Sequence, residues 1–214
     1  VMSGIQYYLT RSGPLANTVL EVMGHFKTRP DADRPDAQVM FGPHSFGDSA
    51  QKGRTPEKEH GFLISPMPLR PRARGEVVIT STDPAVNAKV IYDPFSDPQD
   101  RQELVAGVRF ARQLAATAPL SNYAMQETRP GAAVQTDEQI IESMRKLCGP
   151  AYHAAGTCRM GSDEKSVVDT HTRVRGVRNL HVVDLSISPI ISAGNTYGPV
   201  TALAWRAADL ILGR

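Results

Sequence analysis

The C-terminal part of the chain combines an apolar run, a carboxylate and a long amphipathic segment, in that order. The run NLHVVDLSI predicts a short buried strand, Leu180–Val183, that ends directly before Asp184. The segment SAGNTYGPVTALAWRAADLIL predicts a helix with one apolar face, with Pro199 in its first turn and Gly213 at its end. Open α/β sheets bind ligands at the carboxyl ends of their strands, so this order favours an α/β fold with a ligand near Asp184.

A loop rich in reactive and small residues precedes this segment. It runs from Tyr152 to Gly161 and reads YHAAGTCRMG, with almost no large apolar side chain. Glycines let the backbone approach a ligand closely, and imidazole exchanges a proton near neutral pH. We therefore expect a functional site here, with a plain solvent-facing loop as the alternative.

The first half of the chain predicts a mixture of loops and short strands. Lys27–Pro71 is punctuated by proline and glycine, so it is expected to be rich in loops. Two runs rich in β-branched residues, Gly75–Thr82 and Ala88–Phe95, each predict a strand.

Two helices are expected between these strands and the loop. Asp97 can cap the first, and Pro98 suits its first position. Thr136 and Gln139 form a capping-box pattern at the start of the second, which reads TDEQIIESMRKLC. The loop that contains His153 follows this second helix.

Composition excludes several classes of protein. The 214 residues include 24 basic and 22 acidic side chains, a formal charge of +2 that does not suggest a nucleic-acid surface. No apolar run approaches the roughly 20 residues needed to cross a bilayer. The start of the chain lacks the features of an export signal, and the two cysteines slightly favour a reducing compartment, so a cytoplasmic protein is expected.

Several motifs in this order resemble the C-terminal half of the glucose-methanol-choline oxidoreductases. They are YHAAGTCRMG, VVDTHTRVRGVRNLHVVDLSISP, and GNTYGP followed by an AADLI helix. The resemblance implies an α/β protein. Residues 1–150 would be an α+β substrate-binding domain with a largely antiparallel sheet, and residues 151–214 would be the catalytic loop and the C-terminal part of a Rossmann-like FAD-binding domain.

The same resemblance implies an FAD-dependent oxidoreductase that moves a hydride from a small-molecule alcohol to the flavin. His153 occupies the position of the family's catalytic histidine, and it would accept the hydroxyl proton. Asn195 occupies the second catalytic position, where its amide can hydrogen-bond the substrate oxygen without carrying charge. The residues implied in cofactor binding are Asp184, Leu185, Gly194, Asn195 and Thr196.

One family feature is missing from this sequence. The GxGxxG turn that binds the ADP part of FAD does not occur in a strand-turn-helix context. The expected partner is therefore the N-terminal FAD-binding half that this sequence lacks, and the isolated chain is expected to be inactive.

Two rival interpretations come from other classes. One is a structural zinc site, with Cys148, His153, Cys158 and His171 as candidate ligands, although their spacing is not a standard one. The other is a non-catalytic module of the same fold that binds a ligand or a partner.

Overall fold

The computed structural model describes residues 2–47 and 57–214, and the chain divides into two compact units. The N-terminal unit comprises Val1–Pro68 and Gln102–Cys148. The C-terminal unit comprises Leu69–Arg101 and Gly149–Arg214. Residues 69–101, which the sequence interpretation places in a substrate-binding domain, thus group with the segment that carries His153.

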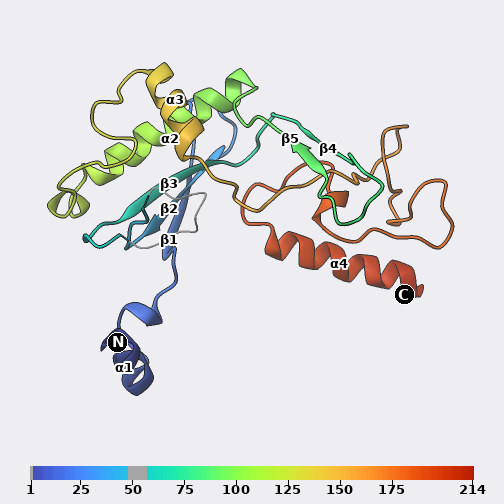
Figure 1. Ribbon diagram of the computed structural model, residues 1–214, viewed down its shortest axis with the longest axis horizontal. Coiled ribbons are helices and arrows are strands. Elements are labelled where there is room, and N and C mark those ends of the chain that lie inside the picture. Colours follow the sequence, from blue (N-terminus) through green and yellow to red (C-terminus); the bar gives the residue numbers. More distant parts are fainter. Residues whose placement is uncertain (1, 48–56) are drawn as a thin grey trace. The chain divides into compact units, whose positions relative to one another are not determined.

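The elements are mixed helices and antiparallel strands, as the sequence predicts, and Figure 1 labels them along the chain. No helix in the described part of the chain is long and apolar enough to span a membrane. In chain order, with η for a 3₁₀ turn, they are α1 (Met2–Thr10), η1 (Pro14–Ala16), β1 (Val22–Phe26), β2 (Ala37–Gly42), β3 (Leu63–Pro68), β4 (Glu76–Val78), β5 (Lys89–Ile91), α2 (Pro98–Ala115), η2 (Leu120–Asn122), α3 (Asp137–Leu147), η3 (Leu185–Ile187) and α4 (Tyr197–Leu212).

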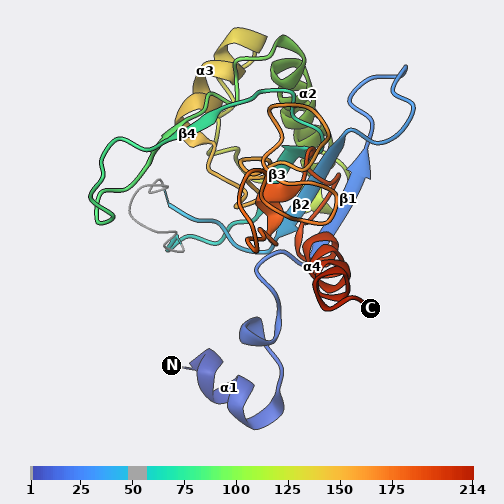
Figure 2. The same cartoon turned by 90° about the vertical axis from the view of Figure 1, so that its right-hand side faces the viewer.

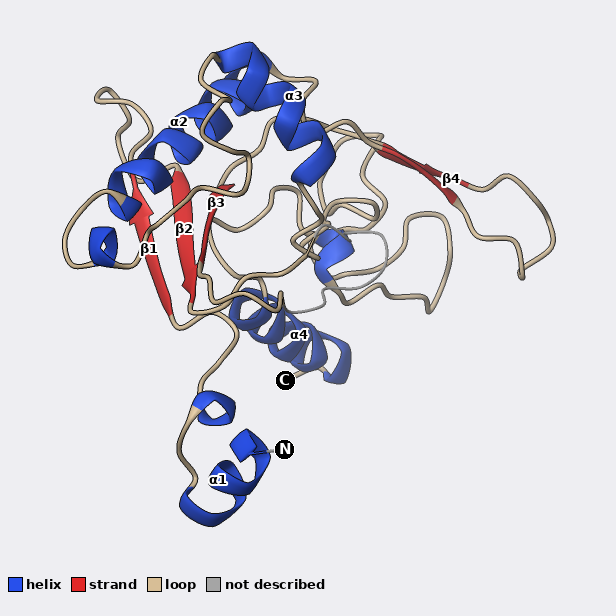
Figure 3. Cartoon of the chain, turned by 60° about the vertical axis from the view of Figure 1, so that its left-hand side comes forward, coloured by secondary structure: helices blue, strands red, loops and turns tan. Residues whose placement is uncertain are grey.

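A three-stranded antiparallel sheet with β2 in its centre forms the base of the N-terminal unit. Because successive side chains of a strand point to opposite faces, each strand gives the sheet two distinct surfaces. Helix α2 packs on one surface, where Phe110 stacks on Phe26 with ring centroids 4.0 Å apart (Figure 3). On the same surface a Cβ atom at Gly107 would come within 2.7 Å of Pro66, so glycine allows the helix to approach the sheet.

The segment Lys27–Pro71 is rich in loops, as the sequence predicts, but it also contains the two strands β2 and β3. The segment AQVMFG is the central strand, and LISPMP pairs along its whole length. Proline is tolerated in β3 because β3 is an edge of the described sheet, where Pro66 and Pro68 need not donate a ladder hydrogen bond. Residues 48–56 of the same region lie outside the described residues.

Both predicted helices of the middle of the chain are confirmed with their caps. The Asp97 carboxylate accepts a 2.8 Å hydrogen bond from the amide of Gln99 at the start of α2. Thr136 and Gln139 form the reciprocal capping box of α3, and Ile140 on that helix is fully buried. The two predicted strands are also present, as the short antiparallel pair β4 and β5.

Helix α1 stands away from the three-stranded sheet of its own unit. Figures 1 and 2 both show it at the far end of the segment that leads into β1. It has no buried residue, and its Tyr8 and Leu9 are 75% and 72% exposed.

The C-terminal unit ends in α4, which is the longest helix in residues 149–214. The rest of residues 149–214 consists largely of hydrogen-bonded turns. Gly213 ends α4 in a left-handed conformation, with φ of 70°, as expected for a C-terminal glycine. The predicted buried strand Leu180–Val183 is wrong. Its backbone pairs only through an isolated bridge between Arg173 and His181, and Leu180 is 48% exposed. The run is apolar enough for a buried strand, but among the described residues it has no strand beside it.

Candidate active site

The YHAAGTCRMG loop is held against the turn that follows Asp184. The amide of Cys158 donates a 3.0 Å hydrogen bond to the carbonyl oxygen of Ser186, and the amide of Met160 donates a 2.8 Å bond to that of Ile187. These bonds join two segments that the sequence interpretation assigns separately to catalysis and to cofactor binding. The structure therefore brings these two predicted regions together.

The backbone of the loop adopts conformations that few residues tolerate. Gly156 has φ of +88°, and a Cβ atom there would lie 3.4 Å from the carbonyl oxygen of Ser188. Tyr152, directly before His153, also lies in the left-handed region, with φ of 59°. For a residue with a side chain this conformation costs roughly 1–2 kcal/mol. The imidazole of His153 is half-buried.

An ion pair closes the end of the loop. The guanidinium of Arg159 donates two hydrogen bonds to the carboxylate of Asp163, at 2.8 and 2.5 Å. These bonds, with a further one from the amide of Lys165, hold the pKa of Asp163 well below its usual range. The same carboxylate raises the pKa of Arg159. Both groups are therefore charged at neutral pH, and the pair ties the two ends of this turn together.

Asp184 caps the short η3 turn. Its carboxylate accepts a 2.8 Å hydrogen bond from the amide of Ser186, while the side chain remains exposed. Leu185 is half-buried and Ile187 is fully buried, so the turn is anchored by its apolar side chain. Asp184 thus has a structural task, and its exposed carboxylate can still accept hydrogen bonds from a ligand.

The remaining predicted residues lead into the N-terminus of α4. Asn195 is exposed and Thr196 is buried, with no side-chain cap on the helix. A Cβ atom at Gly194 would meet nothing within 4 Å. The amides of Tyr197 and Gly198 have no acceptor among the described residues, and they carry the partial positive charge of a helix N-terminus.

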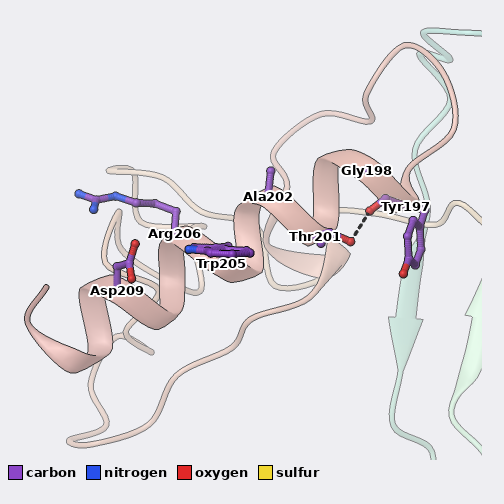
Figure 4. Close-up of a pocket in the computed structure, with 7 residues that line it drawn as sticks. All are labelled: Tyr197, Gly198, Thr201, Ala202, Trp205, Arg206 and Asp209. Atoms are coloured by element: carbon purple, nitrogen blue, oxygen red, sulfur yellow. Dashed lines mark hydrogen bonds between the residues drawn. The ribbon is translucent and has the colours of Figure 1, made fainter.

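One face of α4 borders an open depression of about 570 Å³. Figure 4 shows that it is formed by this helix alone, from Tyr197 at its start to Asp209. Tyr197 and Trp205 are 82% and 74% exposed, so the depression is a surface rather than an enclosed cavity.

Not all predicted residues are brought together. Among the described residues, no hydrogen bond joins His153 to Asn195. Nor do any three His, Cys, Asp or Glu side chains of the described segments lie close enough together to hold a metal ion, and this applies to the candidate zinc ligands Cys148, Cys158 and His171 as well.

Sequence reasoning did not identify the groups that anchor the loop. The carbonyl oxygens of Ser186 and Ile187 are main-chain acceptors. Every residue type has such an oxygen, so the sequence does not indicate which ones anchor the loop. The pair of Arg159 and Asp163 had a usable signal, because opposite charges four residues apart within a glycine-containing loop can meet across a turn.

Known proteins of one family match almost the whole chain. The profile of the GMC oxidoreductase family matches residues 71–204. An uncharacterised GMC-type oxidoreductase of Mycobacterium tuberculosis is 38% identical over 212 residues, which cover 97% of this chain and 39% of that protein. Two proteins of Pseudomonas putida are 35% identical: an alcohol dehydrogenase (acceptor), with 96% of this chain and 37% of that protein covered, and an oxygen-dependent choline dehydrogenase, with 99% and 37% covered.

Solved structures share the fold. A formate oxidase of Aspergillus oryzae has a TM-score of 0.82 at 23% identity, covering 99% of this chain and 41% of its own. A pyridoxine 4-oxidase from Mesorbium loti has a TM-score of 0.78 at 23% identity, covering 92% and 38%. The chain thus spans about two fifths of the length of the relatives it matches. By its sequence and its fold, this chain belongs to the GMC oxidoreductase family.

Proposed function

We propose that this chain is the C-terminal catalytic portion of an FAD-dependent oxidoreductase that oxidises a CH–OH group of a small alcohol. The observation that carries the proposal is the attachment of the YHAAGTCRMG loop to the η3 turn. Through the bonds from Cys158 and Met160, the loop that contains His153 is attached to the turn that Asp184 caps. The relatives named as alcohol and choline dehydrogenases support an alcohol as the substrate.

The residues at the start of α4 fit one part of FAD. The open space over Gly194 and the unpaired amides of Tyr197 and Gly198 suit the edge of a flavin ring, whose oxygens and nitrogens accept hydrogen bonds. Leu185 and Thr196 would line the same region, and Asp184 would accept hydrogen bonds from the cofactor. The ADP part of FAD has no such cradle in this sequence, which lacks the GxGxxG turn. We assign that part to the N-terminal FAD-binding half, the proposed partner of this chain.

In the proposed reaction the bound flavin supplies the acceptor for the hydride that leaves the alcohol carbon. His153 accepts the proton of the alcohol hydroxyl, which lets the carbon–oxygen double bond form as the hydride leaves. Asn195 donates a hydrogen bond from its amide to the substrate oxygen and so orients it. The Arg159–Asp163 pair and the η3 contacts hold the C-terminal part of the loop that carries His153.

The experiment that tests the proposal is anaerobic flavin reduction by alcohols in the FAD-loaded enzyme that contains this chain. Bleaching of the oxidised flavin on addition of an alcohol supports an oxidoreductase. An enzyme that binds FAD but is reduced by no primary alcohol across alkyl, aryl and choline substrates would instead support the non-catalytic binding module.

A further inference from the structure

Helix α1 is left uncovered by the described residues of its own unit. None of its nine residues is buried, and Figure 2 shows the helix away from the three-stranded sheet. Its sequence, MSGIQYYLT, contains no charged side chain. A helix of this length is marginal in water on its own, and a helix without a charged face is normally covered by other parts of a protein. Helix α1 therefore calls for a partner.

One side of α1 is occupied by the segment that follows it. The amide of Arg11 donates a 2.9 Å hydrogen bond to the carbonyl oxygen of Tyr7, and its guanidinium lies over the Tyr7 ring, 5.4 Å from the centroid. Gly13 has φ of +89°, and a Cβ atom there would come within 2.6 Å of the Gln6 side chain. These contacts fold the chain back along the side of α1 that carries Gln6 and Tyr7. We call residues 2–16 the N-terminal arm.

The opposite side of α1 is apolar and open to solvent. Helical spacing puts Met2, Ile5 and Leu9 on one face, with Tyr8 beside them. Met2 is 77% exposed, and the exposed fractions of Tyr8 and Leu9 are nearly as large. Single exposed apolar residues are ordinary on a protein surface, but a contiguous group of them marks a surface that a partner covers. We call these four residues the apolar face of the arm.

The chemistry of this face limits the kind of partner. It offers no charge for a salt bridge, and methionine and tyrosine are enriched where proteins pack on one another. A membrane surface fits less well, because helices that lie on membranes carry a strongly charged polar side, which α1 lacks. A protein surface that is itself apolar fits the face best.

The relatives indicate where such a surface is found. The choline dehydrogenase of Pseudomonas putida matches 99% of this chain, so its matched segment includes a counterpart of α1. The chain covers only 37% of that protein. Helix α1 is therefore part of the sequence that the family shares, while most of the polypeptide available to cover it lies outside this chain.

From these observations we infer that the N-terminal arm is a docking element, whose apolar face packs on an apolar surface of the N-terminal FAD-binding half. The inference rests on the partner assigned in the proposed function. It gives the two halves an attachment that stabilises the enzyme and takes no part in the chemistry at His153.

Hydroxyl-radical footprinting of the full-length, FAD-loaded enzyme that contains this chain measures whether the face is covered. Tyr123 is the matched reference, because it is a tyrosine of the same unit with an exposed fraction of 73%, against 75% for Tyr8. Tyr8 should be oxidised several-fold more slowly than Tyr123. Oxidation of Tyr8 as fast as that of Tyr123 overturns the inference.

Photo-crosslinking of the same enzyme identifies what covers the face. With p-benzoylphenylalanine in place of Leu9, irradiation should link the arm to a peptide of the N-terminal FAD-binding half, as mapped by mass spectrometry. A link to a second copy of the enzyme, a link confined to these 214 residues, or no link at all overturns the inference.

A pair of variants tests what the docking contributes. Tyr8→Asp should lower the unfolding temperature of the FAD-loaded enzyme by about 2–4 °C or more, because it places a carboxylate in an apolar contact. Tyr123→Asp is the matched control and should leave the temperature unchanged. Equal shifts in the two variants overturn the inference. Should Tyr8→Asp fail to fold, footprinting and crosslinking still decide.

The outcomes separate this inference from the proposed function. A readily oxidised Tyr8 in an enzyme whose flavin is reduced by alcohols overturns the docking and leaves the oxidoreductase standing. A protected Tyr8, with a crosslink to the N-terminal half, in an enzyme that no alcohol reduces overturns the oxidoreductase and supports the docking.

Discussion

The main-chain amide of Cys158 donates a hydrogen bond to the carbonyl oxygen of Ser186, and this 3.0 Å contact joins the histidine-containing loop to the turn after Asp184. Its neighbour, from Met160 to Ile187, repeats the connection two residues later. Ile187 is fully buried, so the turn offers a fixed support. The loop that carries the proposed base is therefore attached to this turn through backbone contacts.

Replacement of Gly156 should show how closely the loop must lie on this turn. Gly156→Ala puts a side chain into a left-handed conformation and places a Cβ atom 3.4 Å from the carbonyl oxygen of Ser188. We expect a loss of about 1–2 kcal/mol in the free energy of unfolding and a slower flavin reduction. Urea denaturation and stopped-flow absorbance would measure the two effects.

Gly176→Ala is the matched control for that variant. Gly176 also has a positive φ, of +76°, but a Cβ atom there would meet nothing within 4 Å. It should therefore destabilise the protein by a similar amount without slowing flavin reduction. Equal effects of both substitutions on the reduction rate would contradict a specific role for the Gly156 contact.

The ion pair in the loop predicts that the Asp163 carboxyl group titrates at a lower pH than an ordinary aspartate. Arg159 holds the pKa of Asp163 below its usual range, so the folded state binds this proton less readily than the unfolded chain does. The stabilising contribution is complete above the ordinary aspartate pKa, about 3.9, and it is lost as the pH falls through the lower folded value. An NMR titration of the Asp163 carboxyl carbon would measure this.

Two variants complete the titration experiment. Arg159→Gln should return the Asp163 midpoint to the ordinary range, because the two guanidinium hydrogen bonds are removed. Arg173→Gln removes a guanidinium that instead contacts Asp169, so the Asp163 midpoint should stay low. An Asp163 that titrates normally in the unmodified chain would show that the pair does not persist in solution.

The FAD affinity of the isolated chain tests whether the cofactor site is divided between this chain and an N-terminal FAD-binding half. Because this sequence lacks a GxGxxG turn, we expect the 214-residue chain alone to bind FAD weakly and to be inactive on alcohols. Equilibrium dialysis against FAD, with and without an added N-terminal FAD-binding half, would check this. Purification of the chain alone with stoichiometric FAD and alcohol-oxidising activity would contradict the assignment.

The helices were predictable from sequence because their ends carry side-chain signals. Asp97, and the pair of Thr136 and Gln139, satisfy backbone amides that a helix start leaves free, and the structure shows these bonds. Strand β3 was missed because Pro66 and Pro68 look like loop residues until the strand is known to lie at an edge. The Leu180–Val183 strand was wrong for the opposite reason, since apolar residues alone do not supply a neighbouring strand.

The residues of the candidate site stay predictions from sequence, and the contacts that attach the loop were not predicted. The motifs suggest His153, Asp184 and Asn195 by their order along the chain, and none of these assignments requires a contact. The attachment of the loop to η3 uses main-chain groups, and such contacts appear only when the backbone is folded.

Asn195→Ala should have a moderate effect on the reaction. It removes a neutral hydrogen bond to the substrate oxygen, for which about 1–3 kcal/mol is expected, or roughly 5- to 150-fold in kcat/KM. Asn195 is exposed and does not cap α4, so thermal unfolding of the variant should match that of the wild type. A change in the unfolding temperature without a change in kcat/KM would assign Asn195 a structural task instead.

The rate of anaerobic flavin reduction in a His153→Ala enzyme tests the central claim most directly. With FAD bound and a saturating alcohol, the rate should fall by about 10²–10⁴-fold, as for a lost general base, while His171→Ala, which removes another histidine of the same unit, should not change it. A His153→Ala enzyme that reduces its flavin at the wild-type rate would contradict the assignment of His153 as the base.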